Sequence, residues 1–230
     1  MSSVLGRIRG SLVASIGDIA FGMEDGAVSI AGLVFGVAAS TNDSHVVVLA
    51  GATGAAAGAV SMMAGTYLDV QSVRDRGHAL LAAAEARVRA DPDGQRAEIV
   101  GQLRSAGFTA DEAAVVSGAL GRNPGAMREY VADVQLGLGR GTQESPWAHA
   151  AWMLAADLIA AATPVAPFFF FDIATARLVS LVITGFLLAI LGVGRGRIAH
   201  RNVVGTVLQT LAIAALAAGA GVLIGRLVSG

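Results

Sequence analysis

Two apolar segments near the N-terminus carry acidic side chains within stretches long enough to cross a membrane. Residues 21–40 read FGMEDGAVSIAGLVFGVAAS, and residues 58–75 read GAVSMMAGTYLDVQSVRD. A carboxylate inside hydrocarbon is costly unless it has a partner, a proton or a cation. Glu24 and Asp25 therefore limit the chain to folds that give a polar group a protected place within a membrane, and they favour a protein that handles cations.

Composition supports the membrane class. Hydrophobic residues make up 54% of the chain and charged residues 14%, with a mean hydropathy of +0.65, whereas about a quarter of the residues in soluble domains are charged. A net charge of −1 argues against nucleic acid as a partner. The absence of cysteine excludes disulfides and thiolate metal sites.

Five apolar stretches have the length that a membrane-spanning helix requires. They cover residues 16–40, 46–70, 147–171, 173–193 and 203–227. We therefore expect an all-α membrane protein with five transmembrane helices.

Charge is concentrated between spans two and three. Residues 74–144 hold nine Arg and ten Asp or Glu, which is 19 of the 33 charged residues. This pattern predicts transmembrane helices one and two in residues 1–73, a small cytoplasmic three-helix module in 74–145, and transmembrane helices three to five in 146–230.

Helix boundaries in and after this module have clear signals. A polar N-cap residue before a first-turn proline starts a helix, and a Thr three residues before a Glu forms a capping box. These signals are Thr109 with Glu112, Asn123-Pro124 and Ser145-Pro146. The segment Asp91-Pro92-Asp93-Gly94 is expected to break a helix that continues out of span two.

Arginine distribution predicts the orientation. Basic residues precede span one (Arg7 and Arg9), fill the module, and join spans four and five (Arg195, Arg197 and Arg201). The positive-inside rule then places the N-terminus and the module in the cytoplasm. All 16 basic residues are Arg, a composition typical of a GC-rich bacterial genome, so we expect a bacterial plasma membrane.

The polar residues of the first two spans suit a metal path. Glu24 and Asp25 stand beside a glycine, while Met62, Thr66 and Asp69 lie on one helix face at i, i+4 and i+7. Carboxylate oxygens with a thioether suit divalent transition metals. A buried carboxyl that exchanges a proton for a metal supplies the chemistry of an antiporter. The four His are scattered and no nucleophile motif is visible, so we expect no enzyme.

Simpler interpretations of these residues stay open. Asp25 could cap a helix or hydrogen-bond across a helix interface, and Glu24 could reach the lipid headgroups. Met62 could fill the core, and Asp69 could be solvated at the cytoplasmic mouth. For Asp157, the lone acid of span three, a polar pathway and an interface hydrogen bond are equally open.

Two motifs resemble the vacuolar iron transporter family. Residues 24–39 resemble its first-helix motif, Asn-Asp-Gly-Leu-Val-Ser followed by Gly-Val-Ala-Ala, and residues 58–75 its second, Gly-Ala-Leu-Ser-Met-Ala-Ala-Gly-Glu-Tyr. The resemblance implies a homodimer of five-span subunits in membrane lipid that moves Fe²⁺ or Mn²⁺ out of the cytoplasm against protons. A cytoplasmic helical module would collect the metal.

The resemblance transfers to the spans in part. Asp25 and Met62 match the family's Asp and Met. Thr66 stands where the family has Glu, Glu24 replaces Asn, and Asp69 replaces Ser.

The module departs further from the family. Glu98 matches one of the expected acids and Glu85 matches another approximately, but Gln95 replaces the partner of Glu98. Val131, Val134 and Gln135 occupy positions expected to hold Met and Glu, so we expect this module not to collect metal. The full set of candidate metal residues is Asp25, Glu24, Met62, Asp69, Thr66, Glu98 and Glu85.

We expect no permanently bound cofactor. The cargo would be Fe²⁺ or Mn²⁺, and the same ligand types also suit Co²⁺ and Zn²⁺. The alternative function is a non-transporting membrane scaffold or sensor whose cytoplasmic module binds a partner protein.

Overall fold

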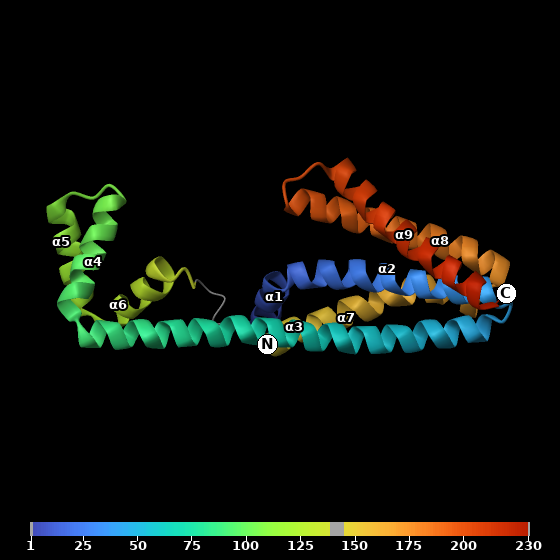
Figure 1. Ribbon diagram of the computed structural model, residues 1–230, viewed down its shortest axis with the longest axis horizontal. Coiled ribbons are helices and arrows are strands. Elements are labelled where there is room, and N and C mark those ends of the chain that lie inside the picture. The colour runs from blue at the N-terminus through green and yellow to red at the C-terminus, as the bar shows by residue number, and fades with distance from the viewer. Residues whose placement is uncertain (1, 139–144, 230) are drawn as a thin grey trace. The chain divides into compact units, whose positions relative to one another are not determined.

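The computed structural model describes residues 2–138 and 145–229, and the chain divides into two compact units (Figure 1). The first unit combines Met1–Leu68 with Ser145–Gly230, and the second is Asp69–Glu144. Every regular element in the described residues is helical. The predicted division into residues 1–73, 74–145 and 146–230 stays a prediction.

The first unit is built from long apolar helices. Five described helices are long and apolar enough to cross a membrane, which confirms the predicted all-α membrane fold. The unit's elements are α1 (Ser2–Ala14), α2 (Ile16–Ser40), the first part of α3 (Ser44–Ala90), α7 (Pro146–Val165) with a 3₁₀ turn (Ala166–Phe169), α8 (Ile173–Ile198) and α9 (Val203–Ser229).

Three features of these helices differ from the predicted spans. The short helix α1 has no counterpart among them. α8 continues five residues beyond the predicted end at 193, because Gly192 and Gly196 let its backbone pack closely on α9. α7 changes to a 3₁₀ turn near Pro167, which has no N–H for a helical bond. The Ser180 hydroxyl donates a 2.8 Å hydrogen bond to the Pro164 carbonyl at this change.

Helix α2 lies at the centre of the first unit, packed mainly against α7 and α9 (Figure 1). Its inward face is made of small and branched apolar residues that are almost fully buried, including Ala27, Ala31 and Val34. Towards its C-terminal end the packing is closer still. A Cβ on Gly36 would lie 2.8 Å from the carbonyl oxygen of Gly221 in α9, so the two helices approach through their backbones.

The second unit continues the single helix α3 and adds three helices and a short π-helical segment. These are α4 (Pro92–Ser105), α5 (Ala110–Arg122), α6 (Pro124–Tyr130) and the π-helical segment Val131–Gln135. Their core is formed by Ala84, Ile99, Met127 and Val131.

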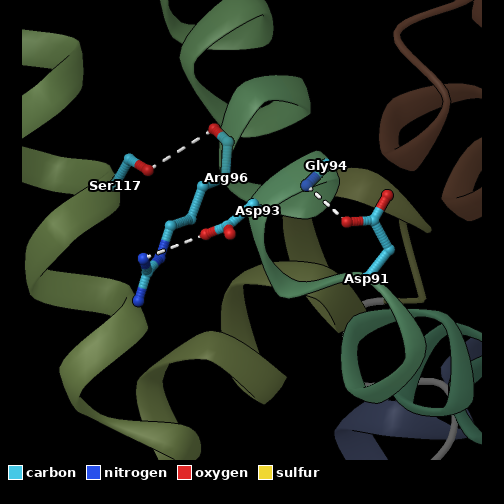
Figure 2. Close-up of polar contacts among 5 residues, drawn as sticks. All are labelled: Asp91, Asp93, Gly94, Arg96 and Ser117. Carbon is cyan, nitrogen blue, oxygen red and sulfur yellow. Dashed lines mark hydrogen bonds and ion pairs between the residues drawn. The ribbon is translucent and has the colours of Figure 1, made fainter.

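The predicted helix break at Asp91 and the predicted caps of α5 and α6 are confirmed. Asp91 accepts a 2.8 Å hydrogen bond from the Gly94 N–H at the start of α4 (Figure 2). Thr109 and Glu112 form the capping box of α5, and Asn123 caps α6. Arg96 pairs with Asp93 one turn away, and its carbonyl accepts from the α5 residue Ser117 at 3.4 Å (Figure 2).

The predicted start of α7 is confirmed. Ser145 stands at the N-cap position and Pro146 begins the helix, although the serine side chain makes no capping hydrogen bond. Because Pro146 has no N–H, the helix start has one fewer donor to satisfy.

Candidate functional site

Glu24 is held by side chains from two other helices. Arg195 of α8 donates from Nη1 to Glu24 Oε2 at 2.7 Å, and Thr210 of α9 donates from Oγ1 to Glu24 Oε1, also at 2.7 Å. The Glu24 side chain is 14% exposed and that of Arg195 37%, while Thr210 is fully buried. Both carboxylate oxygens therefore have a donor within the protein.

Beside this ion pair is a cavity of about 170 Å³. It is an open cavity whose lining residues belong to α2, α8 and α9, and its charged lining consists of Glu24, Asp25 and Arg195. Unlike Glu24, Asp25 makes no hydrogen bond or ion pair with any residue that the structure describes, although it is partly buried. The two adjacent acids thus occupy different environments.

A third acid lies against the same part of α2. Asp157 of α7 is 3% exposed, and its carboxyl packs on Gly26, where a Cβ would lie 2.5 Å from Asp157 Oδ1 and 2.6 Å from its backbone oxygen. Asp157 is close enough to Asp25 for their charges to interact. Sequence analysis identified Asp157 as a lone acid but not its position opposite Gly26.

The predicted residues of α3 are only partly associated with this arrangement. Met62 and Thr66 are half-buried in the first unit, but no described hydrogen bond joins Thr66 to the α2 acids. Asp69 is exposed and begins the second unit. In the first unit, Tyr67 and Trp147 of α7 form a tilted aromatic pair, with ring centroids 4.7 Å apart and ring planes at 49°.

The predicted acids of the second unit have partners that are not metal ligands. Glu85 forms an ion pair with Arg128, with 2.7 Å between Oε1 and Nε. Glu98 Oε1 accepts a 3.4 Å hydrogen bond from Gln102 Nε2. No group of three or more His, Cys, Asp or Glu in the described residues is arranged to hold a metal ion. Glu85 and Glu98 therefore do not form a preassembled acidic site.

Glutamines connect the helices where acids were expected. Gln95 Nε2 donates to Gln135 Oε1 at 3.0 Å, and Gln135 Nε2 donates to Gln102 Oε1 at 3.3 Å. An amide both donates and accepts, so these three side chains satisfy one another without a cation.

The partners of Glu24 were not predicted from the sequence. Arg195 was considered only for the orientation of the helices, and Thr210 only as part of span five. The available signal was that an acid within a span needs a partner, and Arg195 follows the predicted end of span four by two residues.

Five membrane-length helices and acids buried among them define a helical integral membrane protein. The model of the VIT family matches residues 16–226, and the chain belongs to this family.

Relatives align over most of the chain. Vacuolar iron transporter 2 from Oryza sativa subsp. japonica is 30% identical over 204 residues, covering 88% of this chain and 83% of the relative. The vacuolar iron transporter of Centaurea cyanus is 28% identical over 207 residues, 90% of this chain and 84% of its own. Vacuolar iron transporter 1 of Arabidopsis thaliana is 28% identical over 212 residues, covering 92% of this chain and 85% of the relative. The resemblance predicted from the motifs is confirmed.

Proposed function

We propose that the protein transports divalent iron or manganese out of the cytoplasm in exchange for protons. The observation that carries the proposal is Asp25, a partly buried carboxylate without a described protein partner that lines a cavity among membrane helices. The names of the relatives, which state iron transport, support the same conclusion.

Asp25 would be the first ligand of the cargo. Oxygen ligands suit Fe²⁺ and Mn²⁺, and a thioether ligand, which Met62 would supply if the path reaches it, would favour a transition metal over Mg²⁺. The charges of Asp157 and Asp25 interact. Two carboxyl groups at one place repel each other when both are ionised, so a metal ion or a proton between them is favourable. This competition is the physical basis of the proposed exchange.

The proposed setting follows from charge. The arginines at the C-terminal end of α8, Arg195 and Arg197, support a cytoplasmic position for that end under the positive-inside rule. We place the protein in a bacterial plasma membrane, with the second unit cytoplasmic, as a homodimer. No cofactor is needed, because the exchange requires only the metal, the proton and carboxylates.

Reconstitution into liposomes that contain a metal-sensitive dye tests this function. Fe²⁺, Mn²⁺, Co²⁺ and Zn²⁺ are supplied with and without a pH gradient. Uptake that depends on the gradient is expected for Fe²⁺ or Mn²⁺. Asp25→Asn removes the charge at nearly constant size and is expected to abolish uptake.

The matched control is Asp111→Asn, the same chemical change at an exposed position of α5. It is expected to transport normally. Full uptake by Asp25→Asn would contradict the role of Asp25, and metal uptake that ignores the pH gradient would contradict proton exchange.

A second candidate function is a non-transporting scaffold or sensor. The glutamine contacts of the second unit favour it, because Gln95 and Gln135 stand where the family resemblance expects acids and bind each other. This candidate predicts no flux of any of the four metals above that of empty liposomes at any pH gradient.

A further inference from the structure

Arg195 brings a fixed positive charge into the cavity that holds Asp25. Its Nη1 atom is 2.7 Å from Glu24 Oε2, and its side chain is part of the cavity lining. A guanidinium stays protonated at any physiological pH, so this charge cannot be removed by titration.

The arrangement gives the adjacent acids opposite roles. Arg195 and Thr210 use both oxygens of Glu24, so a metal ion could bind Glu24 only by displacing one of them. The pair is only partly buried, with Glu24 the more buried partner, and displacing Arg195 would leave the Glu24 carboxylate without its opposite charge, which is unfavourable. Asp25 has no such partner among the described residues. Glu24 is therefore neutralised by the protein, and Asp25 is left for the cargo.

We propose that Arg195 is a built-in competitor of the transported cation: it occupies Glu24, and its charge limits how tightly a divalent ion is held at Asp25. It is a positioning residue that makes release possible. The inference rests on the proposed function in that the cavity receives the cargo, but it concerns binding and can be tested without transport.

Charge accounting supplies the quantitative expectation. With both acids ionised, the charged lining residues Glu24, Asp25 and Arg195 carry one net negative charge. Removing Arg195 leaves two negative charges, and removing the Glu24 charge leaves none. If Glu24 acts only as the partner of Arg195, removing both charges restores one negative charge and with it the original affinity.

The experiment measures Mn²⁺ binding to the purified full-length chain in detergent by isothermal titration calorimetry. Arg195→Gln is expected to lower the Kd at least about tenfold, and Glu24→Gln to raise it by a similar factor, since a nearby charge acts strongly on a divalent ion at low dielectric. The double variant and Arg195→Lys, which keeps the charge, are expected to bind within about threefold of wild type.

The matched control is Arg197→Gln, an exposed arginine on the same helix end that does not line the cavity. It is expected to leave the Kd unchanged. Size-exclusion profiles and thermal unfolding of every variant separate a binding effect from a folding defect. If Arg195→Gln does not fold, comparison of the double variant with Glu24→Gln still measures the effect of removing the Arg195 charge.

Three outcomes would overturn the inference. An unchanged Kd in Arg195→Gln would reduce Arg195 to a structural role. A double variant as weak as Glu24→Gln would make Glu24 a direct metal ligand. Failure of the wild-type chain to bind Mn²⁺ would remove the competition altogether. If calorimetry gives the expected order of Kd values but liposomes show no metal flux, the proposed function would be overturned and the inference would stand.

Discussion

His149 Nδ1 lies 2.5 Å from Oδ2 of Asp18, so the first turns of α7 and α2 are joined by a polar contact. The histidine side chain is 7% exposed and the aspartate 30%. One turn further along α7, Trp152 Nε1 donates a 3.1 Å hydrogen bond to Ser11 near the C-terminal end of α1. Together these contacts hold the C-terminal end of α1 and the N-terminal parts of α2 and α7 against one another.

Loss of the histidine should weaken this end of the first unit. We expect His149→Ala to lower the free energy of unfolding by about 1–3 kcal/mol, because a buried hydrogen-bonding group loses its partner. Thermal unfolding in detergent measures the change. His45→Ala, at an exposed position, is the control and should have little effect. Equal losses in the two variants would remove the structural role of the contact.

Gly26 should be required where it faces Asp157. Gly26→Ala would place a methyl group 2.5–2.6 Å from Asp157 atoms that include a backbone oxygen, so α2 or α7 must move. We expect a lower unfolding midpoint and reduced metal uptake. Gly17→Ala on the same helix has open space around its Cβ and should be neutral or stabilising by up to about 1 kcal/mol. If the two variants have the same midpoint, the contact with Asp157 does not constrain the helix.

The capping box of α5 should give the second unit a pH-dependent contribution. Side-chain and backbone hydrogen bonds with Thr109 lower the pKa of Glu112 below its ordinary value of 4.5. A lowered pKa means that the ionised form is favoured in the folded state. The stabilisation is therefore present above pH 4.5 and is lost as the pH falls through the folded-state pKa.

Unfolding of the wild type and of Glu112→Gln tests this contribution at pH 6 and pH 3. The difference between the two proteins should be largest at pH 6 and shrink at pH 3. Glu129→Gln, at an exposed position outside the cap, is the control. A difference that does not change with pH would show that the capping contact does not depend on ionisation of Glu112.

The glutamine contacts should make the second unit indifferent to metal. We expect Mn²⁺ to leave the hydrogen exchange of residues 92–135 unchanged in the wild-type chain above pH 6. Gln95→Glu combined with Gln135→Glu would place two carboxylates within the present 3.0 Å contact, one turn from Glu98. Such a group suits a divalent cation, so Mn²⁺ should protect the double variant.

The single variant Gln135→Glu provides the comparison for that experiment, because one new carboxylate opposite an amide offers fewer ligands. It should gain little protection from Mn²⁺. Strong protection of the wild-type second unit by Mn²⁺ would instead indicate a metal site made by its present residues.

Local patterns were enough to predict the helical membrane fold and most helix boundaries. Apolar length predicted the five spans, and short-range cap signals predicted the starts of α5, α6 and α7, because each depends on residues within a few positions of one another. Ser145 takes the predicted N-cap position but makes no side-chain capping hydrogen bond. The choice between capping and non-capping rotamers is made by surroundings that a local pattern does not contain.

The partners within the candidate site could not be predicted in the same way. Glu24 and Arg195 are 171 positions apart, and Asp18 and His149 are 131 apart. Burial requires an acid to have some partner, but which basic or hydroxyl side chain fills that role depends on how α2, α7, α8 and α9 are rotated about their axes. The sequence signal indicated the need for a partner and left its identity open.

The glycine contact between α2 and α9 limits sequence change at one end of α2 more than at the other. At Gly32 and Gly36 the backbone meets that of Gly221 and Gly225, and a side chain at any of these four positions would collide with main-chain atoms, which cannot turn aside. Around Glu24 the contacts of α2 run instead through side chains that can be exchanged together, to Arg195 of α8 and Thr210 of α9. Descendants of this sequence can therefore acquire a new ion preference at one end of α2 while the glycines at the other end preserve the helix crossing.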